Sequence, residues 1–327
     1  MPAFLRTLNL VEPFRIAHGT SSFRTVLRVE HEGCKAEAPF VPYYGEDPEE
    51  TLAMIESGRP VWELPRTAQL AFNLLDHEIA SQASGRPLSA WAAARLGDPT
   101  DYRPPGCRSL GIPEDLEVFA KKVGILAKQF RVLKLKLGSG DLGLDLATVS
   151  VARRAAPQAD LILDVNGGWD PSEAALMIGK LMEDHPALVE QPLHHSHGPE
   201  VWEELRTELP ESSPPLYADE SVQNAADVAR FASCLDGVNV KLLKCGSFDG
   251  AVEMVAAARE HGLGVLLGCM IETSLGTTAA AHLAPWADWI DLDGHFYVEN
   301  DDYEGIVYDA QGQLVMPRRP GIGASPR

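Results

Sequence analysis

The chain has 327 residues, 45% of them hydrophobic and 23% charged, which is typical of a folded globular protein and excludes a disordered one. Its formal net charge of −19 at pH 7 argues against nucleic acid and anionic membrane surfaces as partners, because both would repel it, and leaves small molecules. The length exceeds the roughly 250 residues of a simple (β/α)8 barrel by about one small domain, so we expect two structural parts.

The N-terminal part is predicted to combine an antiparallel sheet with helices. Residues 3–40 contain alternating stretches such as 25–30, and the turn pair Glu32-Gly33 interrupts them, which indicates a meander. A helix is expected over 68–84, ending at Gly85. The Pro-rich stretch 102–106 is predicted to be a linker, so we place the boundary of this domain at residues 1–105.

From residue 106 to 298 short apolar runs alternate with amphipathic stretches. Strands separated by helices imply parallel βαβ units, and seven or eight such units imply a closed barrel. The last segment, 299–327, is predicted to fold back on the N-terminal domain with a short hairpin. The helices expected in the barrel include 114–129, 172–183, 225–233 and 250–261.

Five cysteines are scattered along the chain without a C-x-x-C pair, so we expect reduced thiols rather than a zinc knuckle. The first residues lack the apolar region of a signal peptide, and no run approaches about 18 apolar residues. A cytoplasmic location is therefore expected.

Polar side chains recur at the predicted ends of successive barrel strands. Steps of 28, 26, 29 and 22 residues, each about one strand, one helix and two loops, separate Lys136, Asp164, Glu190, Asp219 and Lys241. Because catalytic groups of such barrels lie where strands end, three carboxylates and the lysines should meet at one rim. Three oxygen ligands without His or Cys favour a hard cation such as Mg²⁺.

Lysine needs a lowered pKa to act as a base, and a nearby dication or a second ammonium group provides it. Lys134 could supply that ammonium beside Lys136 if the strand end brings both side chains to the pocket. The same carboxylates leave little role for a Schiff-base aldolase that uses Lys136 or Lys241 as nucleophile.

Taken together, these motifs resemble those of the enolase superfamily, in its muconate-lactonizing subgroup and its dipeptide epimerases. The resemblance covers nearly the whole chain, including a helix pair over 71–97. It implies a modified (β/α)7β TIM-type barrel with an N-terminal α+β capping domain. It also implies that the substrates are dipeptides and that the protein is a homo-oligomer. The motifs that carry it are Lys134-Leu-Lys136, Asp164-Val-Asn166, Glu190-Gln-Pro192, Asp219-Glu220-Ser221 and 239–246.

The resemblance also assigns roles. It implies that Asp164, Glu190 and Asp219 bind one Mg²⁺ per subunit, and that Lys136 and Lys241 lie on opposite faces of the substrate α-carbon. Two bases on opposite faces permit 1,1-proton transfer through an enolate, because one removes the proton and the other returns it. Lys241, the first lysine of its motif, is chosen over Lys244. Asn166 and Glu220 are expected to support the metal ligands.

A second group of residues would contact substrate. Asp291 and Asp293, at the eighth strand, resemble the aspartates with which dipeptide epimerases hold the substrate α-ammonium group, and two carboxylates suit a cation. Ser109, Cys269 and Ile271 would line the same pocket, together with Lys134.

The capping loops depart from the glutamate-preferring members of that family. Those members carry an arginine where this chain has Gly19, which argues against an Ala-Glu substrate. The aromatic loop 42–45 would suit an apolar or cationic side chain better.

Simpler interpretations compete for several residues. Asp164 could cap a helix, although Asp170 is better placed for that. His194, His195 and His197 could bind zinc, but their spacing is that of a solvent-facing loop. Cys269 is expected to be a pocket wall rather than a nucleophile.

Three functions stay open from the sequence. The first is Mg²⁺-dependent epimerisation of dipeptides. The second is a related reaction on the same scaffold, namely N-acylamino acid racemisation, o-succinylbenzoate synthesis or muconate cycloisomerisation, against which Asp291 and Asp293 argue. The third is a non-catalytic barrel that binds a ligand, which would be expected to have lost some of the lysines and carboxylates.

Overall fold

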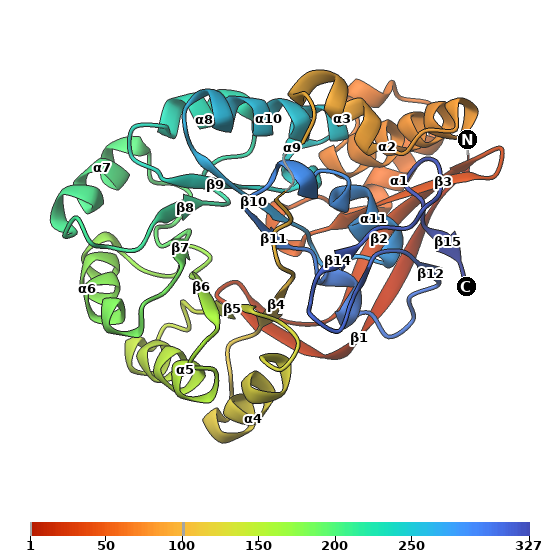
Figure 1. The fold of residues 1–327 in the computed structure, drawn as a ribbon. Helices are drawn as coiled ribbons and strands as arrows, with labels where there is room; N and C mark the ends of the chain where they lie inside the picture. The colour runs from red at the N-terminus through yellow and green to blue at the C-terminus, as the bar shows by residue number, and fades with distance from the viewer. Residues whose placement is uncertain (1, 100–101) are drawn as a thin grey trace.

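The computed structural model describes residues 2–99 and 102–327 (Figure 1). Near the N-terminus three strands form an antiparallel sheet in the order β1-β2-β3. The turn between β2 and β3 passes through Glu32 and Gly33, both with positive φ (48° and 85°), which confirms the predicted meander. The strands are β1 (Ala3–Ile16), β2 (Gly19–His31) and β3 (Cys34–Phe40).

Helices cover one side of this sheet. In α2 (Arg66–Ser84) the face that carries Phe72 and Leu75 is buried against the strands. The helix ends at Gly85, whose left-handed φ of 67° suits glycine, as the sequence predicts. The other helical pieces are η1 (Pro42–Tyr44), α1 (Pro48–Glu56), η2 (Val61–Glu63) and α3 (Ser89–Leu96).

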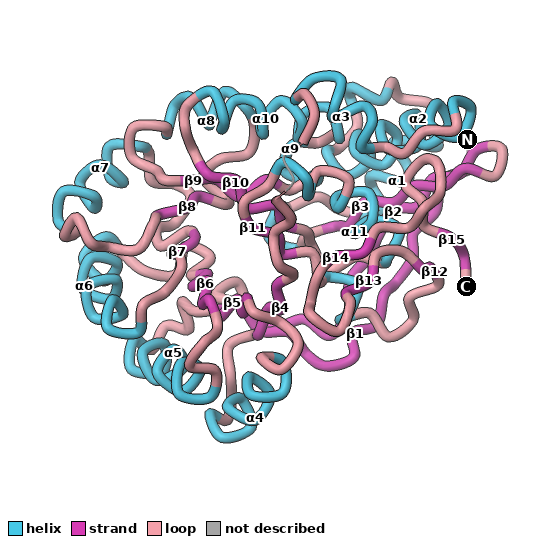
Figure 2. The backbone as a smooth tube through the Cα atoms, in the orientation of Figure 1, coloured by secondary structure: helices cyan, strands magenta, loops and turns pink. Residues whose placement is uncertain are grey.

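Eight parallel strands form the second sheet, in the order in which they follow one another in the chain. The last strand comes back beside the first, so the sheet curves into a nearly closed barrel (Figure 2). The strands are β4 (Cys107–Leu110), β5 (Val132–Lys136), β6 (Asp160–Asp164), β7 (Leu188–Glu190), β8 (Leu216–Ala218), β9 (Gly237–Val240), β10 (Gly264–Gly268) and β11 (Trp289–Asp291).

Helices connect the barrel strands on the outside, and β11 is followed by the short η5 (Gly294–Tyr297) instead, so the predicted (β/α)7β architecture is confirmed. The helices are α4 (Leu116–Leu126), α5 (Leu142–Ala155), α6 (Pro171–Leu181) with η3 (Met182–Asp184), α7 (Pro199–Glu208), α8 (Ala225–Phe231), α9 (Leu242–Cys245), α10 (Phe248–Glu260) and α11 (Ser274–Ala281) with η4 (Ala284–Trp286).

The helices begin and end within a few residues of the predicted positions. Side chains that cap the first turn explain where two of them begin. The predicted helix over 250–261 begins earlier, at Phe248, because the Ser247 side chain accepts a hydrogen bond from the backbone of Gly250. The helix predicted over 114–129 begins at Leu116, where Asp115 is the cap.

Tyr217 closes the barrel interior at the end opposite to the predicted site. Its side chain packs with strand residues such as Ile162 and Leu266. A Cβ atom at Gly237 would lie 2.2 Å from the Tyr217 ring, so glycine makes room for it. The barrel is therefore filled, and a ligand site has to lie at the rim.

The C-terminal segment folds back over the helices of the N-terminal part (Figure 1). The backbone of Gly321 exchanges hydrogen bonds with Arg86 and Leu88, and Ile322 donates to the Glu78 carboxylate. The predicted hairpin is present as β13 and β14. The short strands are β12 (Tyr303–Glu304), β13 (Val307–Tyr308), β14 (Leu314–Val315) and β15 (Ser325–Pro326). No helix within 2–99 or 102–327 is long and apolar enough to cross a membrane.

Candidate active site

The polar residues predicted at strand ends lie together at the carboxyl rim of the barrel. Lys136, Asp164 and Glu190 are the last residues of β5, β6 and β7. Asp219 and Lys241 directly follow β8 and β9. The parallel order β5-β6-β7-β8-β9 makes these positions neighbours around the rim.

A buried lysine joins the carboxylates. The Nζ atom of Lys134 lies 2.9 Å from Asp164 Oδ2, 2.7 Å from Glu190 Oε2 and 2.9 Å from Asp291 Oδ2. Lys136 reaches the same oxygen of Asp164, at 2.6 Å. The two lysines of the β5 motif therefore share one carboxylate. Burial lowers the pKa of Lys134, but the surrounding carboxylates together raise it by more.

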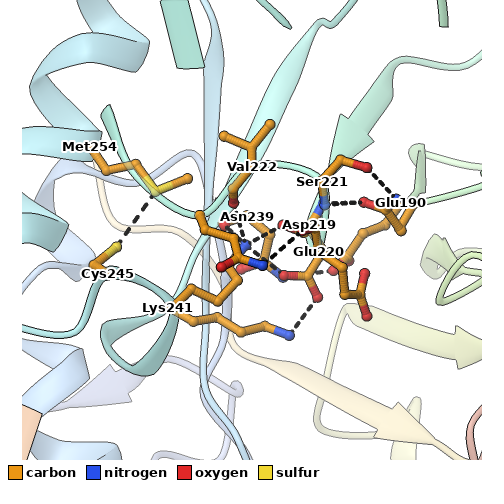
Figure 3. Close-up of polar contacts among 12 residues, drawn as sticks. Glu190, Asp219, Glu220, Ser221, Val222, Asn239, Lys241, Cys245 and Met254 are labelled. Carbon is orange, nitrogen blue, oxygen red and sulfur yellow. Dashed lines mark hydrogen bonds and ion pairs between the residues drawn. The ribbon is translucent and has the colours of Figure 1, made fainter. Parts of the chain in front are cut away.

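The β9 motif holds two lysines with different environments. Lys241 Nζ lies 2.6 Å from Asp219 Oδ2 and lines the cavity at the rim (Figure 3). Burial lowers the pKa of Lys241, but Asp219, Tyr43 and Glu190 together raise it by more.

Lys244, in contrast, is completely buried behind the site. Its ammonium group donates to the backbone oxygens of Asp219, Val222 and Asn239 at 2.6, 3.0 and 2.6 Å. It also lies 2.7 Å from Asp219 Oδ1. Because its three N–H groups are used by backbone oxygens, Lys244 is a structural clamp, and Lys241 is the lysine that faces the cavity.

Asp164, Glu190 and Asp219 are completely buried. Burial raises the pKa of Glu190 to about 7, and Asp164 adds to this effect. Burial also raises the pKa of Asp164, but Lys134, Lys136 and Lys241 together lower it by more, so the net shift is downward. Within the described part of the chain these carboxylates face lysine ammonium groups, and no three His, Cys, Asp or Glu side chains are arranged as a metal-ligating group.

The residues present nevertheless fit a hard dication. Glu190 Oε2 and Asp219 Oδ1 are buried and accept no well-directed hydrogen bond, although each lies 2.7 Å from a lysine ammonium group. Three carboxylates on adjacent strands offer oxygen donors without sulfur or imidazole, which is the donor set of Mg²⁺. The lysine ammonium groups compensate the carboxylate charge in this arrangement.

Amide side chains hold the carboxylates from behind. Asn239 donates to Glu190 Oε1 at 2.6 Å, and Asn166 donates to Glu220 Oε1 at 3.0 Å. Gln191 links the end of β7 to the next loop, since its Oε1 accepts hydrogen bonds from the backbone of Asp219 and Ser221. Sequence reasoning missed Asn239 as a residue that supports the carboxylates. A polar residue between Val238 and Val240 in a buried strand was a signal that its side chain has a polar partner inside the barrel.

The backbone is strained directly beside two of the carboxylates. Asn166 and Gln191 adopt positive φ angles of 48° and 42°, which non-glycine residues rarely do. Such conformations persist where the surroundings hold them, and they are concentrated at functional sites.

A cavity of about 70 Å³ opens at this rim between the barrel and the N-terminal hairpin. It brings together Lys136 and Lys241 with the predicted pocket residues Ser109, Cys269 and Ile271. Burial raises the pKa of the Cys269 thiol, which favours a wall over a nucleophile. The lining also contains Phe14, Ile16, Arg24, Phe40, Val41, Tyr43, Asn166, Met270, Asp291, Asp293, Gly294 and Tyr297.

Most of the lining residues that sequence reasoning missed come from the N-terminal sheet. Phe14, Ile16 and Arg24 lie on β1 and β2, whose alternation predicts strands but not which strand reaches the barrel. Tyr297, on η5, was also missed, and no sequence signal distinguished it.

The eighth-strand aspartates lie beside Ser109 of β4. Ser109 Oγ donates to Asp291 Oδ1 at 2.9 Å, and the Ser109 backbone N–H donates to Asp293 Oδ2 at 2.7 Å. Burial, together with the neighbouring Asp291, raises the pKa of Asp293 to about 6. Burial also raises the pKa of Asp291, but Lys134, Lys136 and the hydrogen bond from Ser109 together lower it by more.

The histidine loop after β7 lies outside this cavity. His194 and His195 stack at 4.2 Å between ring centroids, and the loop forms no metal-ligating group among the described residues. His18, from the β1–β2 turn, packs on Tyr43 at 4.4 Å and lies 4.0 Å from Glu220 Oε1. Burial lowers the pKa of His18, and His195 lowers it further.

Comparison with known proteins assigns the family. Residues 116–327 match the family model described as Enolase C-terminal domain-like. The L-Ala-D/L-amino acid epimerase of Pedosphaera parvula is 39% identical over 257 residues, which cover 77% of this chain and 70% of that enzyme. A hydrophobic dipeptide epimerase of Roseobacter litoralis is 36% identical over 202 residues, which cover 61% of this chain and 57% of that enzyme.

Solved structures agree with this assignment. The L-Ala-D/L-Glu epimerase from Bacillus subtilis superposes with a TM-score of 0.85 at 26% identity, over 99% of this chain and 97% of that one. A dipeptide epimerase from Enterococcus faecalis, complexed with Mg and the dipeptide L-Leu-L-Tyr, gives a TM-score of 0.87 at 27% identity, over 99% and 98%. The chain therefore belongs to the enolase superfamily, within its group of dipeptide epimerases.

Proposed function

We propose that this protein epimerises dipeptides by 1,1-proton transfer at the α-carbon of the C-terminal residue, through an enolate. The observation that carries the proposal is the composition of one cavity, which two lysines and two aspartates line. Lys136 and Lys241 reach it from β5 and β9, and Asp291 and Asp293 from the end of β11.

We propose that Asp164, Glu190 and Asp219 bind one Mg²⁺ per subunit, with Asn166 and Glu220 supporting them. The bound cation supplies positive charge that stabilises the second negative charge that builds on the substrate carboxylate when the α-proton leaves. Lys134 is proposed to contact the substrate, since its ammonium group lies between Asp291 and the metal-ligating carboxylates.

The two lysines are proposed to act as a pair of bases. In one direction Lys136 accepts the α-proton and Lys241 donates a proton to the opposite face, and in the other direction they exchange roles. Lys241 starts as an ammonium group paired with Asp219, which suits the donor role, because that carboxylate raises its pKa.

Asp291 and Asp293 are proposed to bind the N-terminal ammonium group of the dipeptide. Ser109, Cys269 and Ile271 would form the wall between the two ends of the substrate. A charged group held by two carboxylates separates dipeptides from N-acylated amino acids, which lack that ammonium group.

The side chain at the reacting carbon is proposed to be apolar. Phe14, Ile16 and Tyr43 line the cavity, and a relative is a hydrophobic dipeptide epimerase. The loop 42–45 favours apolar or cationic substrate side chains. Cationic side chains are less suited of the two, because the positive charge of Arg24 lines the same cavity.

We expect the protein to be a homo-oligomer in the cytoplasm, without nucleic-acid or membrane partners. Light scattering would measure the mass of the assembly.

Deuterium exchange tests the proposal. A dipeptide library is incubated with the Mg²⁺-loaded enzyme in D₂O, and mass spectrometry locates the label. We expect label at the α-carbon of the C-terminal residue, and its loss in the double variant Lys136→Ala/Lys241→Ala. Exchange confined to N-acylated amino acids would instead support a racemase, and no exchange with metal bound would support a binding protein.

A further inference from the structure

Arg108 lies behind the proposed ammonium subsite. It precedes Ser109 on β4, and successive residues of a strand point to opposite faces, so Ser109 faces the substrate cavity while Arg108 faces away from it. Its guanidinium lines a second cavity, of about 710 Å³, between the barrel and the C-terminal segment. Arg108 does not line the substrate cavity, so any effect on the substrate must pass through another residue.

Asp293 is that residue. Its Oδ2 atom accepts a hydrogen bond from the backbone N–H of Ser109 at 2.7 Å and forms an ion pair with Arg108 Nε at 3.3 Å. The Tyr297 hydroxyl lies 3.0 Å from the same oxygen and shares its one proton between Asp293 and the backbone oxygen of Ser109. None of the hydrogen bonds and ion pairs found among the described residues involves Oδ1 of Asp293. The carboxylate is therefore fixed through one oxygen, and the other is available to the cavity that Asp293 lines.

Aromatic rings hold Arg108 in this place. The guanidinium carbon lies 4.2 Å from the ring centroid of Phe296, 5.6 Å from Tyr297 and 5.7 Å from Phe130. Such contacts stabilise a guanidinium that has left water. Within the described residues, the one ion pair of Arg108 is the pair with Asp293.

Asp293 needs such a partner because its surroundings oppose its charge. Burial and the neighbouring Asp291 raise the pKa of Asp293 to about 6, and Arg108 limits that rise. Tyr297 faces the carboxyl group from η5, and Cys269, directly after β10, accepts a hydrogen bond from the backbone of Gly294, the residue that follows Asp293. Without Arg108, no cation would contact Asp293 directly, since Lys134 is paired with Asp291.

We propose that Arg108 is a positioning residue that holds Asp293 as a charged and oriented carboxylate, and thereby sets the preference for substrates with a free N-terminal ammonium group. The inference rests on the proposed function. It deepens that function by identifying a residue outside the cavity that determines which substrates bind there.

Paired ligands test the inference. One is the dipeptide with alanine as its N-terminal residue, and the other is its N-propionyl analogue, which differs by the absence of the ammonium group. Dissociation constants for both are measured by calorimetry at pH 7 with the Mg²⁺-loaded enzyme. We expect Arg108→Met to weaken the dipeptide about tenfold or more and to leave the propionyl analogue within about twofold, because one charged contact is lost. Arg108→Lys, which keeps the charge, should retain most of the affinity.

The pH profile separates positioning from a structural role. In the wild type the ratio of the two dissociation constants should change below about pH 6, where Asp293 takes up a proton. In Arg108→Met this change should begin at least about one pH unit higher, because the charge that opposes protonation is absent. The range stays below the pKa of roughly 8 of a terminal amine, so the ligand keeps its charge.

Two results would overturn the inference. An equal loss of affinity for both ligands would mean that Arg108 only maintains the structure, and an unchanged ratio at all pH values would mean that it plays no part. If Arg108→Met does not fold, Tyr297→Phe, which removes a second donor to Asp293 Oδ2, takes its place with the same expected direction. Failure of the proposed function is recognised separately, since it appears as absent α-proton exchange in the wild type.

Discussion

At the scale of single residues, the surroundings of a lysine decide its role. Lys241 and Lys244 are separated by two residues in the chain and both contact Asp219, one at each carboxylate oxygen. Lys241 lines the cavity, whereas Lys244 is enclosed by backbone oxygens of the loop after β8 and of β9. A short helical turn, α9, puts the two side chains on different sides of Asp219.

Replacement of each lysine by methionine should separate the two roles. Lys244→Met removes the buried ammonium group that donates to three backbone oxygens and pairs with one carboxylate oxygen, so we expect it to lower the free energy of unfolding by about 3 kcal/mol or more. Lys241→Met, the matched control, should keep the fold and lose epimerisation. Urea denaturation and the exchange assay measure these effects, and equal stability of the two variants would contradict the clamp role of Lys244.

Single lysine variants should also reveal the face on which each base acts. Lys136→Ala and Lys241→Ala should each reduce epimerisation by roughly 10²-fold or more, because proton transfer in one direction loses its acid or base. Each variant should still exchange the α-proton of the one epimer whose proton faces the surviving lysine. Exchange measured separately on L,L- and L,D-dipeptides tests this expectation, and equal loss for both epimers in both variants would count against a two-base mechanism.

At the scale of the secondary-structure element, caps fix where the barrel helices begin and therefore where the loops at the rim end. Asp170 accepts a hydrogen bond from the backbone of Glu173, and the Glu173 side chain accepts one from Asp170 in return. The sequence predicts Asp170 rather than Asp164 as the cap, and this is confirmed. Asp164 is therefore not used as a helix cap, and at the barrel rim it forms ion pairs with Lys134 and Lys136 of β5.

The cap of α6 should affect stability without affecting chemistry. Asp170→Ala removes the reciprocal hydrogen bonds at the helix start, and we expect it to lower the melting temperature by about 2–4 °C. Because Asp170 does not line the cavity, the rate of exchange at 25 °C should not change. Calorimetry and the exchange assay test the two halves of this prediction, and a large loss of activity with an unchanged melting temperature would contradict it.

At the scale of the whole molecule, buried polar contacts join parts that are far apart in the chain. Arg28 of β2 pairs with Glu37 of β3 at 2.7 Å, and Glu37 accepts a hydrogen bond from the backbone of Thr273, at the start of α11. His282, just after α11, joins three parts, because its Nδ1 accepts from the Ser89 backbone and its Nε2 contacts the Ile322 oxygen at 2.9 Å. The neutral imidazole, with its proton on Nε2, satisfies both partners.

Stability should fall in mild acid because of His282. Burial lowers its pKa to about 4, from 6.5 in the unfolded chain. The unfolded state therefore binds more protons between these values, and the stability that His282 contributes is complete above pH 6.5 and is lost as the pH falls toward 4. We expect a loss of about 2 kcal/mol between pH 7.5 and pH 5. Denaturation at both values, with His282→Gln as the control that lacks this dependence, measures the effect.

The sequence predicted the barrel, the meander and the strand-end positions of the lysines and carboxylates, because these depend on local periodicity and on the length of one βα unit. It predicted the start of a helix less well, since Ser247 and Asp115 act as caps through one and two hydrogen bonds, respectively, that periodicity does not reveal.

The cavity wall was decided by tertiary structure. Phe14 and Arg24 reach the rim because β1 and β2 extend from the N-terminal sheet to the barrel, and no local pattern specifies that contact. The ion pair of Arg108 with Asp293 spans 185 positions of the chain and depends on β4 lying beside β11. The sequence by itself thus determined which lysines and carboxylates stand at the ends of the barrel strands, because residue chemistry and βα spacing are local. Which oxygen each lysine meets, and which residues enclose the substrate, follow from the closure of the barrel, which brings its first and last strands together.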